Sequence, residues 1–117
     1  MTIDSDFAYR FAQQWVAAWN AHDLDAILSH YAEDIVFLSP IAAMTVGNGR
    51  IEGKQALRSY WTRGLAARPD LHFRLEQILT GHDCLALLYR NQRDQQVSES
   101  FEFDGSGQVI RSLACYG

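Results

Sequence analysis

The residue that points most clearly to chemistry is Glu99, a carboxyl where an apolar side chain is expected. From Val97 to Phe103 the other odd positions are apolar, while the even positions are all polar. Successive side chains of a β-strand point to opposite faces, so this alternation predicts Glu99 on the inner face beside Val97 and Phe101. Burial of an unpaired carboxylate is costly. We therefore expect Glu99 to be hydrogen-bonded, paired with an inward Arg, or protonated with a raised pKa, unless it is simply exposed near the strand end.

The glycine-rich stretch 47–54 does not match a nucleotide-binding motif. A Walker loop needs Gly at position 48 and Ser or Thr at position 55, where this sequence has Asn48 and Gln55. The dinucleotide fingerprint also fails, because Glu52 stands where its third glycine should be. We interpret these glycines as turn residues and expect no cofactor.

The histidines and cysteines lack the spacing of a metal site, so none is predicted. The sequence contains His22, His30, His72, His82, Cys84 and Cys115. We expect His22 and His82 to be solvated, and both cysteines to be free, buried thiols without chemistry.

Charge and length limit the class of protein. The 117 residues fit one domain, 1–117, and the ten basic and fourteen acidic residues give a net charge of −4 with no basic run. Nucleic acids and anionic membranes are therefore poor candidate partners. The longest apolar stretch, Cys84–Tyr89, is too short to span a membrane, and the first basic residue is Arg10, so no signal peptide is expected. We expect a soluble, cytoplasmic protein.

Three helical segments precede most of the predicted strands. Large apolar residues recur every four positions in 6–20, with Ser5 or Asp6 as its cap. A second helix starts after Asp23 and keeps its apolar period through Tyr31. A third runs from about 56 to 65. The periodic residues of the first helix are Phe7, Phe11, Trp15 and Trp19.

The strands give the fold class. A short strand at 35–38 ends at Ser39–Pro40, and a loop over 41–53 follows. After Asp70 the apolar period changes from 3.6 to 2. The later strands are predicted at 71–76, 84–91, 97–103 and 109–116. The order ααβαββββ predicts an α+β domain, with three N-terminal helices packed on a curved, mostly antiparallel sheet.

Four phrases, in this order, resemble the nuclear transport factor 2-like superfamily, which includes SnoaL-like cyclases and ketosteroid isomerase. They are Trp19–Asp25, Tyr31–Phe37, Ile51–Leu57 and Phe101–Ile110. The resemblance covers nearly the whole chain and implies a cone-shaped half-barrel with a pocket between sheet and helices, often paired as a homodimer across the outer sheet face. It implies no single reaction, because members isomerise, cyclise, dehydrate or hydrolyse small hydrophobic molecules, and others only bind or assemble.

Ketosteroid isomerase is the sharpest comparison within the superfamily. The resemblance implies that its carboxylate base corresponds to Ser39, its tyrosine to Trp15 and its protonated aspartic acid to Glu99. Ser39 cannot accept a proton at neutral pH without a base of its own, and Trp15 donates only through its indole nitrogen. The standard ketosteroid isomerase reaction is therefore not expected.

Our leading hypothesis is a SnoaL-like pocket protein for a compact apolar ligand, with Glu99 as its main polar group. If it is an enzyme, we expect cofactor-independent proton transfer (isomerase or cyclase) or addition of water (hydrolase or dehydratase), with Glu99 as the acid or base. The predicted pocket residues are Trp15, Trp19, Phe37, Tyr60 and Phe101 as walls and Ser39, Tyr89 and Asn91 as hydrogen-bonding groups.

The alternative is a non-catalytic dimerisation or assembly module with a collapsed pocket. An open volume of roughly 300 Å³ or more reaching Glu99 would favour the first hypothesis. In either case we expect a homodimer through the sheet face that carries Arg111, Leu113 and Cys115. Arg93, in a predicted hairpin, is interpreted as part of a solvated edge.

Overall fold

The computed structural model describes residues 3–117, which form four helices and six strands. The helices are α1 (Ser5–Asn20), α2 (Leu24–Leu28), α3 (Pro40–Val46) and α4 (Lys54–Ala67). The strands are β1 (Tyr31–Leu38), β2 (Arg50–Glu52), β3 (Arg74–Thr80), β4 (Cys84–Arg90), β5 (Gln96–Phe103) and β6 (Val109–Tyr116). The predicted α+β class is confirmed.

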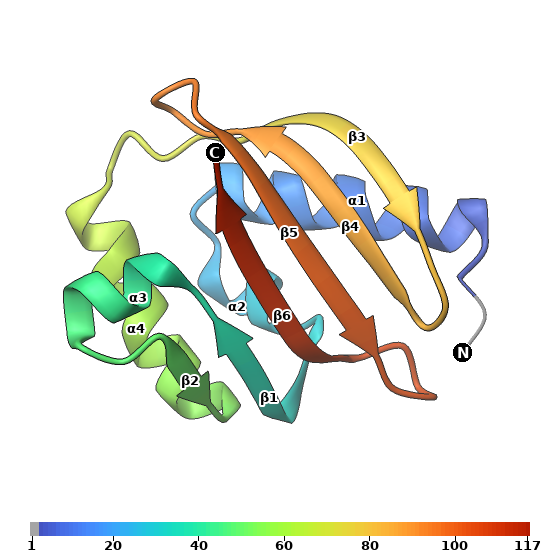
Figure 1. The fold of residues 1–117 in the computed structure, drawn as a ribbon, viewed down its shortest axis with the longest axis horizontal. Coiled ribbons are helices and arrows are strands. Elements are labelled where there is room, and N and C mark those ends of the chain that lie inside the picture. Colours follow the sequence, from blue (N-terminus) through green and yellow to red (C-terminus); the bar gives the residue numbers. More distant parts are fainter. Residues whose placement is uncertain (1–2) are drawn as a thin grey trace.

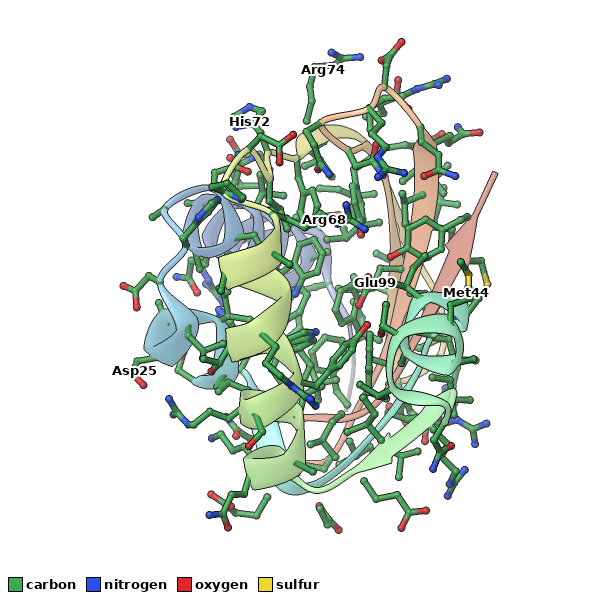
Figure 2. The ribbon with its side chains drawn as sticks, turned by 90° about the vertical axis from the view of Figure 1, so that its left-hand side faces the viewer. Asp25, Met44, Arg68, His72, Arg74 and Glu99 are labelled. Carbon is green, nitrogen blue, oxygen red and sulfur yellow. The ribbon has the colours of Figure 1, made fainter. Side chains whose placement is uncertain are left out.

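All six strands belong to one sheet in the order β2-β1-β6-β5-β4-β3. Every neighbouring pair is antiparallel except β1 and β6, which run parallel. Figure 1 shows α1 crossing one face of the curved sheet behind β3, β4 and β5. In the turned view of Figure 2, α4 lies in front of the same face, so helices and sheet enclose a cone-shaped interior.

Two aspartates fix the first helical turns. The Asp4 carboxylate accepts a hydrogen bond from the backbone N–H of Phe7 at 2.8 Å, so the cap lies one residue before the predicted Ser5. The Asp23 carboxylate accepts from Ala26 N–H at 3.1 Å, as predicted. The second helix ends at Leu28, however, and Tyr31 opens β1, because its backbone pairs with Val109 of β6.

The stretch 41–53, predicted to be a loop, contains α3 and β2. The Ser39 hydroxyl accepts from Ile41 N–H at 3.1 Å and caps α3, whose first residue is Pro40. Gly47 ends the helix with a φ of 78°, a left-handed conformation that favours glycine. β2 then pairs with β1, which short sequence patterns did not reveal because the ladder joins distant residues.

The predicted strand at 71–76 begins only at Arg74. The Asn20 side chain donates to Phe73 C=O at 2.9 Å and accepts from Phe73 N–H at 2.7 Å, so this backbone is bonded to α1 instead of a strand. His22, predicted to be solvated, is half-buried, and its Nε2 lies 2.9 Å from Leu71 C=O. These two side chains fix the α4–β3 connection against the end of α1.

Both cysteines are free thiols but, contrary to the prediction, neither is buried: Cys84 is half-buried and Cys115 is exposed. Their strand neighbours Leu85 and Ala114 point inward, so alternation turns the thiols outward. No helix within residues 3–117 is long and apolar enough to cross a membrane.

Candidate functional site

A cavity of about 150 Å³ lies between the sheet and the helices α1 and α4. This volume is half of the roughly 300 Å³ expected for a small-molecule site. It is lined by Trp15, Trp19, Phe37, Ser39, Ile41, Tyr60, Trp61, Gly64, Leu65, Arg68, Leu71, Phe73, Tyr89, Asn91, Gln92, Arg93, Gln95, Val97, Glu99 and Tyr116. The walls are mostly apolar and include eight aromatic residues, so the space suits a compact apolar group.

Glu99 projects into this cavity from the middle of β5. Its side chain lies between α4 and the sheet in Figure 2, and the residue is only 5% exposed. The Tyr89 hydroxyl donates to Oε1 at 3.2 Å, and the Ser112 hydroxyl donates to Oε2 at 3.1 Å. Within residues 3–117 no Lys, Arg or His forms an ion pair with it. The inward orientation predicted from strand alternation is confirmed.

The environment raises the pKa of Glu99 to about 7. Burial is the main cause, because removal of water penalises the ionised form. The hydrogen bonds from Ser112 and Tyr89 favour the carboxylate and offset part of this rise. At neutral pH the side chain therefore exists in both protonation states, as an acid–base group requires.

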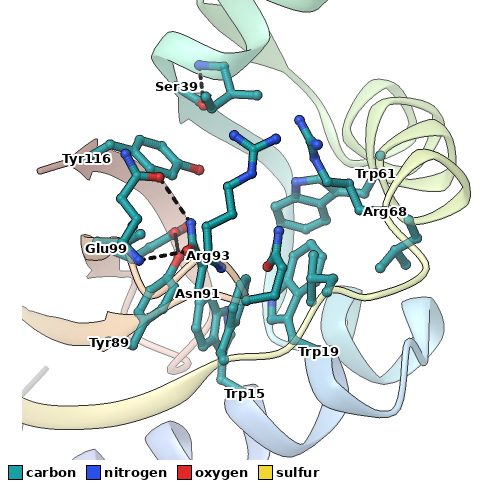
Figure 3. Close-up of a pocket in the computed structure, with 18 of the residues that line it drawn as sticks. Trp15, Trp19, Ser39, Trp61, Arg68, Tyr89, Asn91, Arg93, Glu99 and Tyr116 are labelled. Carbon is teal, nitrogen blue, oxygen red and sulfur yellow. Dashed lines mark hydrogen bonds between the residues drawn. The ribbon is translucent and has the colours of Figure 1, made fainter.

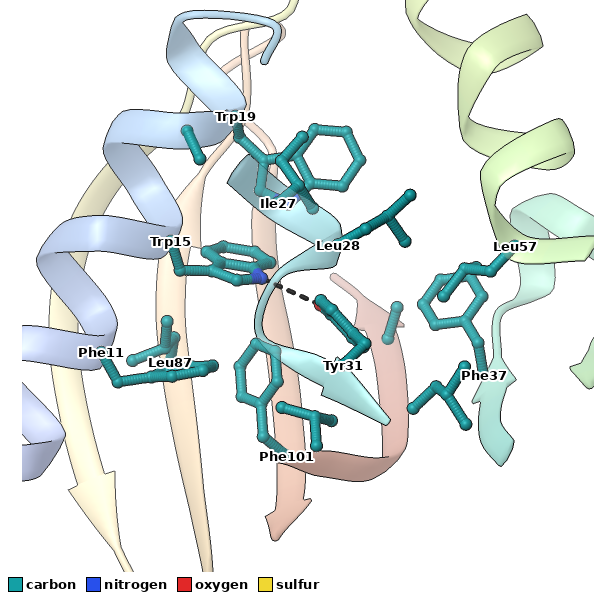
Figure 4. Close-up of a cluster of buried hydrophobic side chains, with 14 of the residues drawn as sticks. Phe11, Trp15, Trp19, Ile27, Leu28, Tyr31, Phe37, Leu57, Leu87 and Phe101 are labelled. Carbon is teal, nitrogen blue, oxygen red and sulfur yellow. Dashed lines mark hydrogen bonds between the residues drawn. The ribbon is translucent and has the colours of Figure 1, made fainter. Parts of the chain in front are cut away.

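The polar atoms at two of the ketosteroid isomerase positions are engaged elsewhere. The indole N–H of Trp15 donates to the Tyr31 hydroxyl at 3.0 Å, as the dashed line in Figure 4 marks. The Ser39 oxygen accepts the backbone N–H groups of α3. Of the three ketosteroid isomerase positions, only Glu99 therefore presents an acid–base group to the cavity.

The structure brings seven of the predicted pocket residues together, as Figure 3 shows in part. They are Trp15, Trp19, Phe37, Ser39, Tyr60, Tyr89 and Asn91. Phe101 does not line the cavity and is fully buried, which corrects the prediction. Its ring packs edge-on against Phe11 and Trp15, with centroids 4.9 and 5.2 Å apart, because position 101 lies nearer the closed end of the cone.

Asn91 lines the cavity, but its amide holds the β4–β5 loop. Its Oδ1 accepts the backbone N–H groups of Arg93 at 3.0 Å and Gln95 at 3.1 Å. Its Nδ2 donates to the Gln95 side chain at 3.2 Å. Asn91 therefore positions the loop at the end of the pocket.

Several lining residues were missed by the sequence reasoning. Arg68 directly follows α4, and Arg93, interpreted as a solvated edge, reaches the cavity from the β4–β5 loop. Tyr116 lines the pocket although the residue is 37% exposed. Trp61 and Leu65, in the apolar stripe of α4, and Val97, on the inner face of β5, had a usable signal in the periodicity of the sequence. Among the described residues, no group of three or more His, Cys, Asp or Glu side chains is placed to hold a metal ion.

The chain is similar to known proteins in sequence and in structure. The sequence matches the family model described as the SnoaL-like domain over residues 12–116. No curated protein matches it. The structure of a SnoaL-like protein of unknown function from Burkholderia thailandensis is 40% identical, with a TM-score of 0.96, and the match covers 100% of this chain and 99% of that one.

More distant structures share the fold alone. AclR from Streptomyces galilaeus, described as a candidate hydroxylase, is 22% identical with a TM-score of 0.74, covering 97% of this chain and 77% of its own. A candidate isomerase of the SnoaL-like family from Agrobacterium tumefaciens is 15% identical with a TM-score of 0.75, and the match covers 94% of this chain and 97% of that one.

Proposed function

Because this chain belongs to the SnoaL-like domain family, we propose that it binds a compact, largely apolar molecule in the aromatic cavity. Glu99 is the polar group that meets the ligand. The observation that carries this proposal is a buried carboxyl facing the cavity, with two hydroxyl donors and no ion-pair partner in the described chain. A buried carboxyl without an ion-pair partner lowers the stability of the fold, and contact with a bound ligand would account for its presence.

Glu99 suits cofactor-independent proton transfer. As a carboxylate it takes a proton from an activated carbon or from water that adds to the ligand, and as the acid it returns that proton to another atom. The Tyr89 and Ser112 hydroxyls hold the two carboxyl oxygens, so the group is oriented in either state. An isomerase or cyclase, or an enzyme that adds water, uses this chemistry.

The walls select for size and shape. Trp15, Trp19 and Phe37 line the cavity with flat apolar faces, and Tyr60 closes the side near α3 and α4. The small volume limits the buried part of a ligand to about one ring, since an apolar cavity of this size holds benzene.

The test is a fragment screen with single-ring compounds, read by ligand-detected NMR on wild type, Glu99→Gln and Glu102→Gln. Glu102 lies on the same strand with the opposite, exposed orientation, so its variant removes an equal charge outside the pocket. We expect hits on wild type that weaken at least about ten-fold in Glu99→Gln and stay unchanged in Glu102→Gln. Equal binding by all three proteins would remove Glu99 from the ligand site.

The alternative, an assembly module with a collapsed pocket, is less well supported because a cavity is present and reaches Glu99, although its volume of about 150 Å³ is below the roughly 300 Å³ expected of a small-molecule site. An assembly role for the outer sheet face is compatible with a working pocket. That face has a central uncharged patch on three adjacent strands, and we propose that it pairs two copies of the chain. The patch comprises Ala86, Leu88, Ser98, Ser100, Leu113 and Cys115.

Sedimentation at micromolar concentration tests this pairing. We expect twice the chain mass of 13.3 kDa for wild type. Leu113→Glu, which places a charge in the half-buried patch, should give monomers, whereas Tyr9→Glu on the exposed side of α1 should not. A monomeric wild type would rule the pairing out.

We also propose a cytoplasmic location, since an exposed free thiol such as that of Cys115 stays reduced in a reducing compartment. Cell fractionation that recovers the protein outside the cytoplasm would overturn this.

A further inference from the structure

Two guanidinium groups lie where the pocket meets solvent, those of Arg68 and Arg93. Arg68 is half-buried at the end of α4, and Arg93 is exposed on the β4–β5 loop. In Figure 3 the Arg93 side chain lies between Tyr116 and Trp61, and the Arg68 side chain lies beside Trp61. A ligand entering the aromatic cavity therefore passes both cations.

In the part of the chain that the structure describes, no acidic side chain pairs with either group. The neighbouring arginines are paired: Arg74 with Asp94 at 3.3 Å, and Arg90 with Glu76 at 3.4 Å. Within residues 3–117 the guanidinium groups of Arg68 and Arg93 have no ion pair and no hydrogen bond to protein. Glu99 is the only acidic residue among the described lining residues, so the opening carries an excess of positive charge in a chain of net charge −4.

The charge of Arg68 acts inside the pocket. Burial raises the pKa of both Tyr60 and Tyr116, and Arg68 opposes the rise in each case, because a cation favours the phenolate form. An anionic ligand group at this position would be stabilised by the same field.

The loop that carries Arg93 is held in place before any ligand binds. Asn91 accepts the backbone N–H of Arg93, and the Gln95 side chain donates to Gly117 C=O at 3.0 Å. Asp94 completes the turn with a φ of 58°. Because the loop is fixed, less conformational entropy is lost when Arg93 meets an anion.

A third polar feature lies deeper. The indole N–H of Trp19 and the side-chain oxygen of Gln92 are buried without a hydrogen-bond partner among the described residues, and both residues line the cavity. Trp19 is only 6% exposed. A buried donor without a partner is costly, so an oxygen atom of a bound ligand that accepts from Trp19 would gain affinity.

We propose, on the basis of the ligand-binding function above, that the ligand is a compact organic acid, with one ring in the aromatic cavity and its carboxylate held by Arg68 and Arg93. Guanidinium groups bind carboxylates through paired, charge-assisted hydrogen bonds. The far edge of the ring then faces Glu99. The cavity of about 150 Å³ sets the one-ring size.

Calorimetry with three probes tests the ligand class on the full chain. Phenylacetate has both ring and charge, phenylacetamide has the ring without the charge, and acetate has the charge without the ring. We expect phenylacetate to bind wild type at least about ten-fold more tightly than either other probe, with the preference reduced by added salt. Equal binding of phenylacetate and phenylacetamide would overturn the acid while leaving the pocket function intact. Failure of both ring compounds to bind at millimolar concentration would contradict both proposals.

Three variants locate the charge effect. Arg68→Gln and Arg93→Gln should each weaken phenylacetate about ten-fold and leave phenylacetamide unchanged. Arg63→Gln removes the same charge from an exposed position of α4 outside the pocket and should change neither. An equal loss in all three variants would mean a general charge effect and would overturn the assignment to Arg68 and Arg93.

Discussion

The closed and open ends of the cone are built from the same two elements, α1 and β5, yet they differ in kind. At the closed end the Phe11 ring packs edge-on against Phe101 and Phe103, with centroids 4.9 and 5.1 Å apart, and the His30 ring packs on Phe11 at 5.2 Å. One step further along each element, Trp15 and Glu99 line a cavity. The inward-facing side chains of α1 and β5 thus form a filled core at one end of the cone and line a pocket at the other.

The difference shows how a small domain combines stability and binding. The closed end is tightly packed, so it stabilises the fold through buried apolar area. The open end keeps a cavity and a buried carboxyl, both of which lower stability. Substitutions at the two ends should therefore change the free energy of unfolding in opposite directions or by unequal amounts.

The largest expected effect is at the closed end. Phe101→Ala should lower the free energy of unfolding by about 3–5 kcal/mol, because it opens a new cavity in a filled core. Phe73→Ala, in the half-buried pocket wall, should cost less than half as much, because its ring already borders open space. Urea titration of both variants measures this. Equal losses would show that the two ends are packed alike.

The next effect concerns the pH dependence of stability. The pKa of Glu99 is about 7 in the folded protein against 4.5 for the free group, so the folded state binds a proton more tightly. This lowers the stability of wild type as pH rises from about 4.5 to about 7, by about 3 kcal/mol in total. Glu99→Gln lacks this loss, so its stability relative to wild type should rise through the same window.

Comparison with the variant is needed because His30 titrates in part of the same range. Burial lowers the pKa of His30 below 6.5, which makes stability rise with pH up to about that value in both proteins. Urea unfolding of wild type and Glu99→Gln at pH 5 and pH 8 isolates the Glu99 contribution. A constant difference between the two proteins would contradict a desolvated carboxyl.

A smaller effect is expected where α1 holds the pocket wall. Asn20→Ala removes both hydrogen bonds to Phe73 and should cost about 1–3 kcal/mol, since two half-buried backbone groups lose their partners. It should also weaken fragment binding, because the connection lining the pocket loosens. Asn48→Ala, which loses one exposed turn bond, serves as the control with a smaller cost and unchanged binding. Unchanged fragment binding by Asn20→Ala would show that the two Asn20–Phe73 hydrogen bonds do not affect the pocket.

The smallest effect is expected on the outer surface of the sheet. Replacing both Cys84 and Cys115 with Ala should change stability by less than about 1 kcal/mol and leave ligand binding intact, because neither thiol reaches the cavity. The two cannot form a disulfide, since they lie two strands apart and are paired four positions apart along β5. Loss of binding in the double variant, with the fold preserved, would show a role that we have missed.

Local pattern was sufficient for features that depend on neighbours in the chain. The four-residue period of Phe7 to Trp19 predicted α1, and alternation in β5 predicted the inward Glu99. Both succeed because helix and strand geometry repeat over a few residues. The order of elements and four short phrases were sufficient for the fold family.

Only the tertiary structure decided which inward-facing residues line the cavity and which fill the core. Phe101 and Glu99 share one face of β5, but Phe11 fills the space at Phe101 and no side chain fills it at Glu99. The Arg68 and Arg93 side chains meet the same pocket from an α4 terminus and a hairpin far apart in the chain. Such proximity arises when helices close over the sheet, and no periodicity within a single segment encodes it.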